Sequence, residues 1–218
     1  QLFWQSKNVS LMKRRYALGQ LIVSPWTFSL RRSIKDNTLV RRLSRRWEKS
    51  KDYSVAVLDS MPDEAIEFSP SNDQLTFVQH LIHLSFFNNM FFGFMMDDSG
   101  FTDMETLFNA EYLLERPDNI NIFNQSKLSK RDGYKNKALV SLYMKDTYNF
   151  VLTTLMKIDD EFLSKGLAKN KPEFFGGHSN LDLILRGENH TAHHRAQAIA
   201  YLRMKGIEPP GYGVYNIL

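Results

Sequence analysis

The stretch from Gln74 to Asp97, QLTFVQHLIHLSFFNNMFFGFMMD, decides the fold class. If this stretch forms a helix, its Phe, Met and Leu side chains surround nearly the whole circumference. A helix that is apolar on every side is stable only when other elements cover every side. We therefore predict that the segment is a buried helix packed among other helices.

Two further segments have the periodicity of long helices. Between Asn37 and Ser60 an inner face recurs at steps of three and four, while most of the arginines fall on other faces. The residues of this expected inner face are Val40, Leu43, Trp47, Ser54 and Leu58. The second segment runs from Lys130 to Phe162 and is expected to be one continuous helix. The candidate inner face of the latter is Leu139, Leu142, Tyr143, Thr147, Phe150, Leu155 and Ile158.

The last long helix is predicted to begin near Ser179, because Ser179 and Asp182 have the spacing of a capping box, and to end at Gly206. A short helix closed by Pro117 is expected within residues 99–120. The chain has no βαβ alternation, internal repeat or Gly-rich phosphate loop. We conclude that the fold class is all-α, and that a four-helix bundle is the most economical architecture.

Positive charge is concentrated at the N-terminal end. Up to Lys51 the chain has 13 Lys and Arg against 2 Asp and Glu, which leaves 15 against 22 of the totals of 28 and 24. Residues 1–36 are predicted to be a basic tail outside a bundle domain of residues 37–218. The tail is alternatively an export signal starting at Met12, or a remnant that is not native.

No transmembrane segment is expected. The longest apolar stretch, residues 90–96, is much shorter than the ~20 residues that cross a bilayer. We expect a cytoplasmic protein, with export through the N-terminal segment as the alternative. We do not expect nucleic acid as a partner, because the sequence has no helix-turn-helix or zinc-finger pattern.

Histidines on two of the predicted helices are candidate metal ligands. The chain has no cysteine, so a metal has to be held by His, Asp or Glu. His190 and His194, in NHTAHHRAQ (residues 189–197), are four positions apart and share one helix face. His83 lies in the apolar helix, where an imidazole without a partner is costly to bury. The three would form a three-nitrogen site with open positions, although core histidines that satisfy each other by hydrogen bonds explain the pattern as well.

Other polar residues are assigned by their place on the last helix. Asn189, Arg195, Gln197 and Tyr201 are candidates to support the ligands or to bind a substrate, and no catalytic residue is assigned. The remaining histidines are expected to lie outside the site, with His80 reaching a backbone or solvent group. These are His80, His178 and His193.

Two motifs carry a family resemblance. LTFVQHLIHLSFFNNMFF (residues 75–92), followed by GENHTAHHRAQAIAYLRMKGIEPPGY (residues 187–212), resembles the DinB family of DinB/YfiT-like metal proteins. The likeness extends from Asn37 to Tyr215. It implies an up-down-down-up four-helix bundle, often dimeric, with a divalent metal on one His of the second helix and the HxxxH pair of the fourth. In this sequence those positions are His83, His190 and His194, and Ala196 replaces a frequent glycine of the motif.

The resemblance leaves two function classes open. In the first, the protein is a metal-dependent enzyme, similar to thiol S-transferases or hydrolases, that acts on a small thiol or electrophile with bound Zn, Ni, Mn or Fe. The alternative is a non-catalytic stress-response module in which the metal links the second and fourth helices and the basic tail contacts nucleic acid or a membrane. A symmetric homodimer is expected from residues 89–96, NMFFGFMM. The apolar surface of their Phe and Met side chains is more than one bundle should be able to bury, so a second chain is expected to cover the rest.

Overall fold

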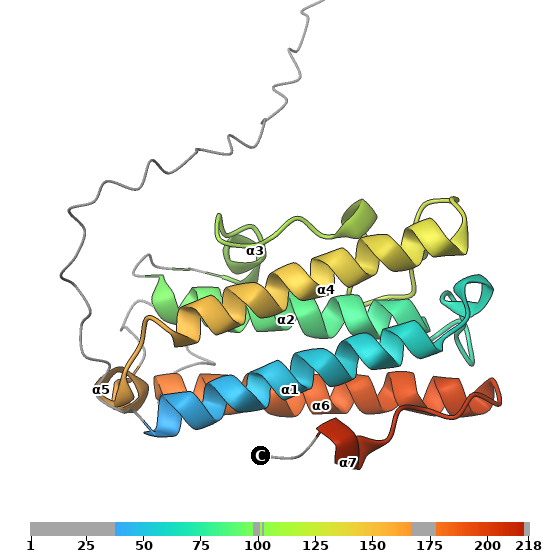
Figure 1. Cartoon of the computed structure of the whole chain (residues 1–218). Coiled ribbons are helices and arrows are strands. Elements are labelled where there is room, and N and C mark those ends of the chain that lie inside the picture. The colour runs from blue at the N-terminus through green and yellow to red at the C-terminus, as the bar shows by residue number, and fades with distance from the viewer. Residues whose placement is uncertain (1–37, 98–100, 102, 167–177, 216–218) are drawn as a thin grey trace, which may run out of the picture. The chain divides into compact units, whose positions relative to one another are not determined.

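A computed structural model describes residues 38–97, 101, 103–166 and 178–215. All of them belong to a compact unit that begins at residue 36. Four long helices dominate it (Figure 1). They are α1 (Thr38–Ser60), α2 (Phe77–Met96), α4 (Gly133–Leu155) and α6 (Asn180–Met204). Short elements connect or follow them: η1 (Asp63–Ala65), α3 (Met104–Phe108), η2 (Pro117–Asn119), α5 (Asp160–Ser164) and α7 (Tyr212–Tyr215).

The long helices pack in a ring. Helix α2 lies mainly against α4 and α6, and α1 closes the ring by lying against the same two helices (Figure 1). Across the described ranges the structure has helices and no strand, apart from one isolated bridge between Gly166 and Ser179. The all-α, four-helix prediction is confirmed, and the up-down-down-up order of helix directions stays a prediction.

Helix α2 is the buried helix that its composition predicts. Thr76 and Gln79 form a capping box at its start, and every residue of the helix is buried except Phe87 and Met96. In the stretch expected to face a second chain, residues 89–96, every residue except Met96 is therefore buried within this chain. The homodimer stays a prediction, but the argument for it from the apolar surface of this stretch was wrong.

The segment from Lys130 to Phe162 is not one helix, which corrects the prediction. Helix α4 ends at Leu155, and α5 begins after Asp159, whose carboxylate accepts a hydrogen bond from Phe162 N at 2.9 Å. The inner face was also partly wrong, because Leu142 is 59% exposed. The buried residues of α4 are both polar and apolar; they are Asn136, Val140, Tyr143, Met144, Thr147, Tyr148, Val151, Thr154 and Leu155.

Residues 103–120 cover the outside of α2. They contain the short helix α3 and the single turn η2, which starts at Pro117. The ring of Tyr112 lies so close to Gly93 that a Cβ there would overlap with its Cδ2 atom. Gly93 is thus needed for this segment to pack against α2.

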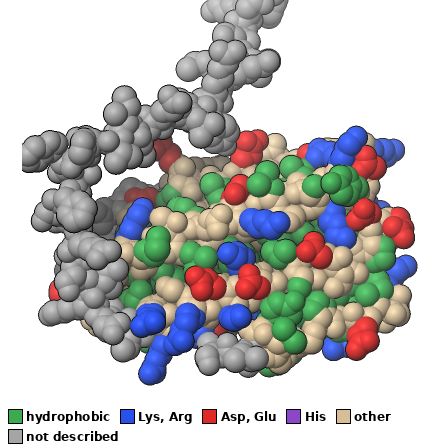
Figure 2. Space-filling view, viewed as in Figure 1, with side chains coloured by type: hydrophobic (Ala, Val, Ile, Leu, Met, Phe, Trp, Pro, Cys, Tyr) green, Lys and Arg blue, Asp and Glu red, His purple; other side chains and the backbone are tan. Residues whose placement is uncertain are grey.

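Helix α6 starts and ends close to the predicted positions. Ser179 and Asp182 form the expected capping box, and the helix ends at Met204, two residues before Gly206. Gly206 has a φ of 73°, which a glycine adopts without strain. None of the helices in the described part of the chain combines the length and the hydropathy that a membrane-spanning helix needs. On the face that Figure 2 shows, side chains of both charges are interspersed with hydrophobic ones.

Candidate metal centre

The three predicted ligands converge where α2 and α6 lie side by side. One imidazole nitrogen from each of His83, His190 and His194 lies within 4.8 Å of the other two. The Nε2 atoms of His83 and His190 are 3.1 Å apart, and the ring centres of His83 and His194 are 4.1 Å apart. The structure therefore brings together side chains that are more than 100 positions apart in the sequence.

The tautomer of His83 is set by the backbone. Its Nδ1 donates a hydrogen bond to the carbonyl oxygen of Ile122, in the segment between η2 and α4. The same segment is tied to the start of α2 because Gln79 Nε2 donates to the carbonyls of Asn121 and Asn124 at 2.6 and 2.9 Å. With its proton on Nδ1, His83 presents a bare Nε2 to His190.

The distance between the two Nε2 atoms fits a shared cation. Two nitrogens bound at ~2.0–2.1 Å to one ion lie about 2.9 Å apart at a right angle and about 3.4 Å apart at a tetrahedral angle. The 3.1 Å between His83 and His190 falls in this range. His190 Nδ1 is buried and has no hydrogen-bond partner within the described ranges, so no contact opposes this orientation of its Nε2. The residues present fit a divalent metal.

Burial keeps these imidazoles neutral. Loss of hydration, followed by repulsion from neighbouring imidazoles, lowers the pKa of His190 to about 3 and that of His194 to about 2. Burial also lowers the pKa of His83, although its hydrogen bond to Ile122 opposes the shift. Neutral imidazole is the form that binds a metal, so no proton has to leave when an ion enters at neutral pH.

His80 does not reach a backbone or solvent group, which corrects the prediction. It is 7% exposed, its Nδ1 lies 3.0 Å from His194 Nδ1, and its Nε2 lies 3.4 Å from the hydroxyl of Tyr201. Burial and the neighbouring imidazoles lower the pKa of His80 to about 4. A signal was present in the sequence, since His80 and His83 are three apart and so lie on adjoining faces of one helix.

The other candidates on α6 take different places. Tyr201 lies beside His80, whereas Gln197 is exposed. His193 is exposed, with its ring edge-on to that of His194, and His178 is partly buried just before the cap of α6. These two histidines lie outside the group of three, as predicted.

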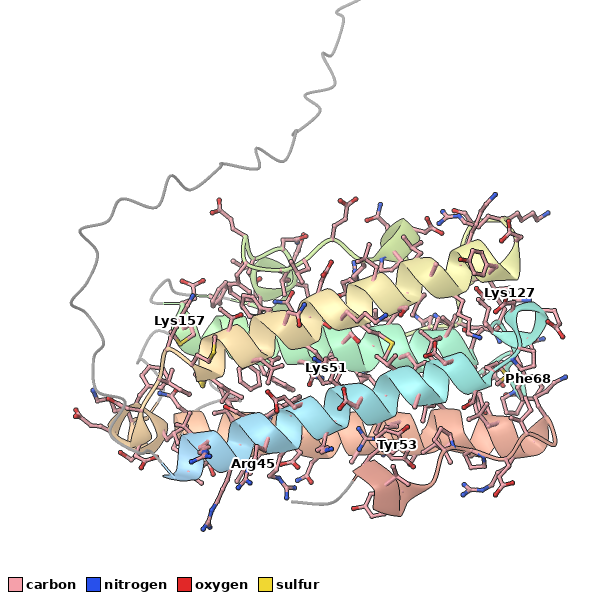
Figure 3. The ribbon with its side chains drawn as sticks, in the orientation of Figure 1. Arg45, Lys51, Tyr53, Phe68, Lys127 and Lys157 are labelled. Carbon is pink, nitrogen blue, oxygen red and sulfur yellow. The ribbon has the colours of Figure 1, made fainter. Side chains whose placement is uncertain are left out.

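Arg195 and Asn189 face α1 rather than the three imidazoles. Arg195 Nη1 donates to Ser50 Oγ at 2.9 Å and to Ser54 Oγ at 3.2 Å, and its guanidinium lies 4.7 Å from the ring centre of Tyr53. Tyr53 is labelled on α1 in Figure 3. Arg195 and Asn189 both line a cavity of about 380 Å³ between α1, α6 and α7.

Aromatic rings cover one side of the histidine cluster. The ring centre of Phe87 lies 4.7 Å from those of both His83 and His190. Phe123 is edge-on to His83 at 6.1 Å and is 56% exposed. The approach to the cluster on this side is therefore apolar.

An all-helical bundle with three imidazoles between two of its long helices defines a class of domains that could hold a metal ion. The family model of the DinB superfamily matches residues 46–198, which include all three histidines. The chain belongs to the DinB superfamily. No curated protein matches it in sequence.

Proposed function

We propose that the protein is a metal-dependent enzyme, of the thiol S-transferase or hydrolase type, that uses one divalent cation held by His83, His190 and His194. The observation that carries the proposal is the convergence of three neutral imidazole nitrogens within 4.8 Å of one another. DinB-superfamily membership supports it.

The donor set supports an open coordination sphere. The group found among the described residues contains three histidines and no carboxylate. Three protein ligands leave room for water or substrate, as catalytic sites require, whereas structural zinc sites have four. The nearest acid on α6, Glu188, is paired with Arg46 of α1. Imidazole ligands accept Zn, Ni, Mn or Fe, so the identity of the ion is left open.

The chain itself offers few groups for the chemistry. A bound divalent cation would supply Lewis acidity, which lowers the pKa of a water or thiol bound to it. The thiol has to come from outside, because the chain has no cysteine. Thr191 stands where HExxH metalloproteases have their general base, and it is buried against Asn88, which argues against a protease of that type.

The role of the chain is then to hold neutral ligands and to exclude water. His83 is oriented by Ile122, and Phe87 shields the face shared by His83 and His190. The apolar approach beside Phe123 favours a substrate with an apolar portion next to its electrophilic carbon.

The test is turnover by the metal-loaded protein with small thiols and electrophiles, and with ester substrates. We expect activity that chelation removes while the far-ultraviolet circular dichroism spectrum stays unchanged. If the chelator unfolds the protein at room temperature, the metal is a structural staple and the enzyme proposal is wrong. A protein that binds metal and turns over none of these substrates would favour the non-catalytic module.

A further inference from the structure

We propose that His80 is a positioning residue, which fixes the tautomer of His194 through a hydrogen-bond chain that starts at Gln74 and passes through Tyr201. The consequence for metal affinity rests on the proposed function. The hydrogen-bond chain itself does not rest on the proposed function, because it joins only side chains of this protein and includes no metal ion.

The direction of each hydrogen bond follows from its donors and acceptors. The hydroxyl of Tyr201 donates to Gln74 Oε1 at 2.9 Å. Because the proton of the hydroxyl is used in that bond, its oxygen accepts a hydrogen bond from His80 Nε2–H, 3.4 Å away. The Nδ1 of His80 is then bare, and it accepts a hydrogen bond from His194 Nδ1–H at 3.0 Å. His194 is left with a bare Nε2.

The result matches the state of His83. That residue also carries its proton on Nδ1, where it donates to Ile122, and it also has a bare Nε2. An outer partner of this kind holds the tautomer and the ring orientation of a ligating imidazole. Among the three proposed ligands, His190 has no such partner on Nδ1 within the described ranges. Thus His83 uses a backbone carbonyl, whereas His194 uses a side chain.

The need for a side chain has a local cause. Within α6 the backbone carbonyls accept hydrogen bonds from the helix itself, so His194 has to be supported from another element. Helix α2 supplies His80, one turn before His83. His80 lies outside the group of three possible ligands, which fits a supporting role rather than a fourth bond to the ion.

The two middle members of the hydrogen-bond chain are protected from solvent, whereas Gln74 is exposed and His194 is partly buried. His80 and Tyr201 are 7% and 3% exposed. The ring of Phe68, labelled in Figure 3 near the end of α6, lies edge-on to Tyr201 at 5.8 Å. Buried hydrogen bonds of this kind are not readily replaced by water, so loss of one link is expected to reach His194.

The first experiment measures tautomers in the metal-free, full-length protein by long-range ¹H–¹⁵N NMR at pH 7.5. We expect the proton of His194 on Nδ1 and that of His80 on Nε2. In Tyr201→Phe, which keeps the ring but removes the hydroxyl, His80 should become a mixture of tautomers. A His194 proton on Nε2 in the unmodified protein would overturn the proposal, even if no metal binds.

The second experiment measures Zn²⁺ affinity by competition with a chromophoric chelator. His80→Leu should weaken binding about 10- to 100-fold. His80→Asn should recover most of the loss, because its amide oxygen can take the place of Nδ1 as an acceptor. The Zn²⁺ affinity of Tyr201→Phe should lie between the affinities of these two variants. The control is His193→Gln, on the exposed side of α6, which should bind Zn²⁺ as tightly as the unmodified protein does.

The outcomes separate a supporting role from others. Unchanged affinity in His80→Leu would overturn the proposal. A Co²⁺ absorption spectrum that loses one nitrogen ligand in this variant would overturn it too, since His80 would then bind the ion directly. If His80→Leu does not fold, the tautomers and the affinity of Tyr201→Phe decide. If the unmodified protein binds no metal, the proposed function is wrong. The NMR experiment then still shows whether the hydrogen-bond chain fixes the tautomer of His194.

Discussion

His83 Nε2 on α2 lies 3.1 Å from His190 Nε2 on α6, although 107 positions separate the two residues. Their approach depends on the register between these helices. A second contact sets the same register: the hydroxyl of Thr191 lies 2.8 Å from Nδ2 and 3.0 Å from Oδ1 of Asn88. Both residues are at most 1% exposed. The metal centre and this buried contact are thus two parts of one interface.

Thr191→Val is expected to destabilise the protein by ~1–3 kcal/mol. The substitution keeps the shape but leaves the amide of Asn88 buried without its partner. Urea unfolding of the metal-free protein measures the loss. Gln197→Ala, at an exposed position of the same helix, is the control and should change stability little. Equal stability of the two variants would contradict the importance of this contact.

The metal-free protein should lose stability as the pH falls below about 6.5. Burial lowers the pKa of His80 to about 4 and that of His190 to about 3, whereas in the unfolded chain these groups have the ordinary value of 6.5. Between these values the unfolded state binds protons that the folded state does not. The free energy of unfolding therefore decreases with falling pH, by ~1.4 kcal/mol per pH unit for each proton taken up.

Urea unfolding at pH 7.5, 6.0 and 5.0 tests this dependence. His190→Asn removes one of the buried imidazoles, so its stability should fall less steeply than that of the unmodified protein. Stability that is constant or rises towards pH 5.0 would show that the folded state takes up at least as many protons as the unfolded state, so that the pKa values of these histidines are not lowered by folding.

Arg195→Met should cost ~1.5–3 kcal/mol of stability and leave metal binding intact. The guanidinium donates to Ser50 and Ser54 of α1, and the hydroxyl of Ser54 also lies 2.9 Å from that of Tyr148 on α4. Arg195 thus helps to tie three helices together, away from the imidazoles. Thermal unfolding and metal content are the measurements. Arg203→Met, at an exposed position, is the control; loss of metal in Arg195→Met would place this residue in the site after all.

The sequence predicts the helices well where apolar periodicity alone decides them. In α1 the expected inner residues Val40, Leu43, Trp47, Ser54 and Leu58 are all buried. The prediction from periodicity was wrong between Leu155 and Asp160. There Asp159 caps the start of a new helix, and no proline or glycine marks the break between the two helices. Helix existence was therefore easier to predict than helix ends.

The parts of the site differ in the same way. The pairing of His190 with His194 follows from helical geometry, and His83 stood out because its surroundings are apolar. The places of Asn189 and Arg195 depend on which neighbour each side of α6 meets, and α6 packs against both α1 and α2. That His80 meets His194 depends likewise on the rotation of one helix against another, which one sequence does not fix.

The most direct test of the account is the metal content of the purified protein, measured by mass spectrometry, for single substitutions of each histidine. We predict one divalent ion per chain in the unmodified protein and in His193→Ala. His83→Ala, His190→Ala and His194→Ala should each lose the ion while keeping their helical circular dichroism. Equal loss in all four variants, or no ion in the unmodified protein after incubation with Zn, Ni, Mn and Fe, would contradict a metal centre at these three residues.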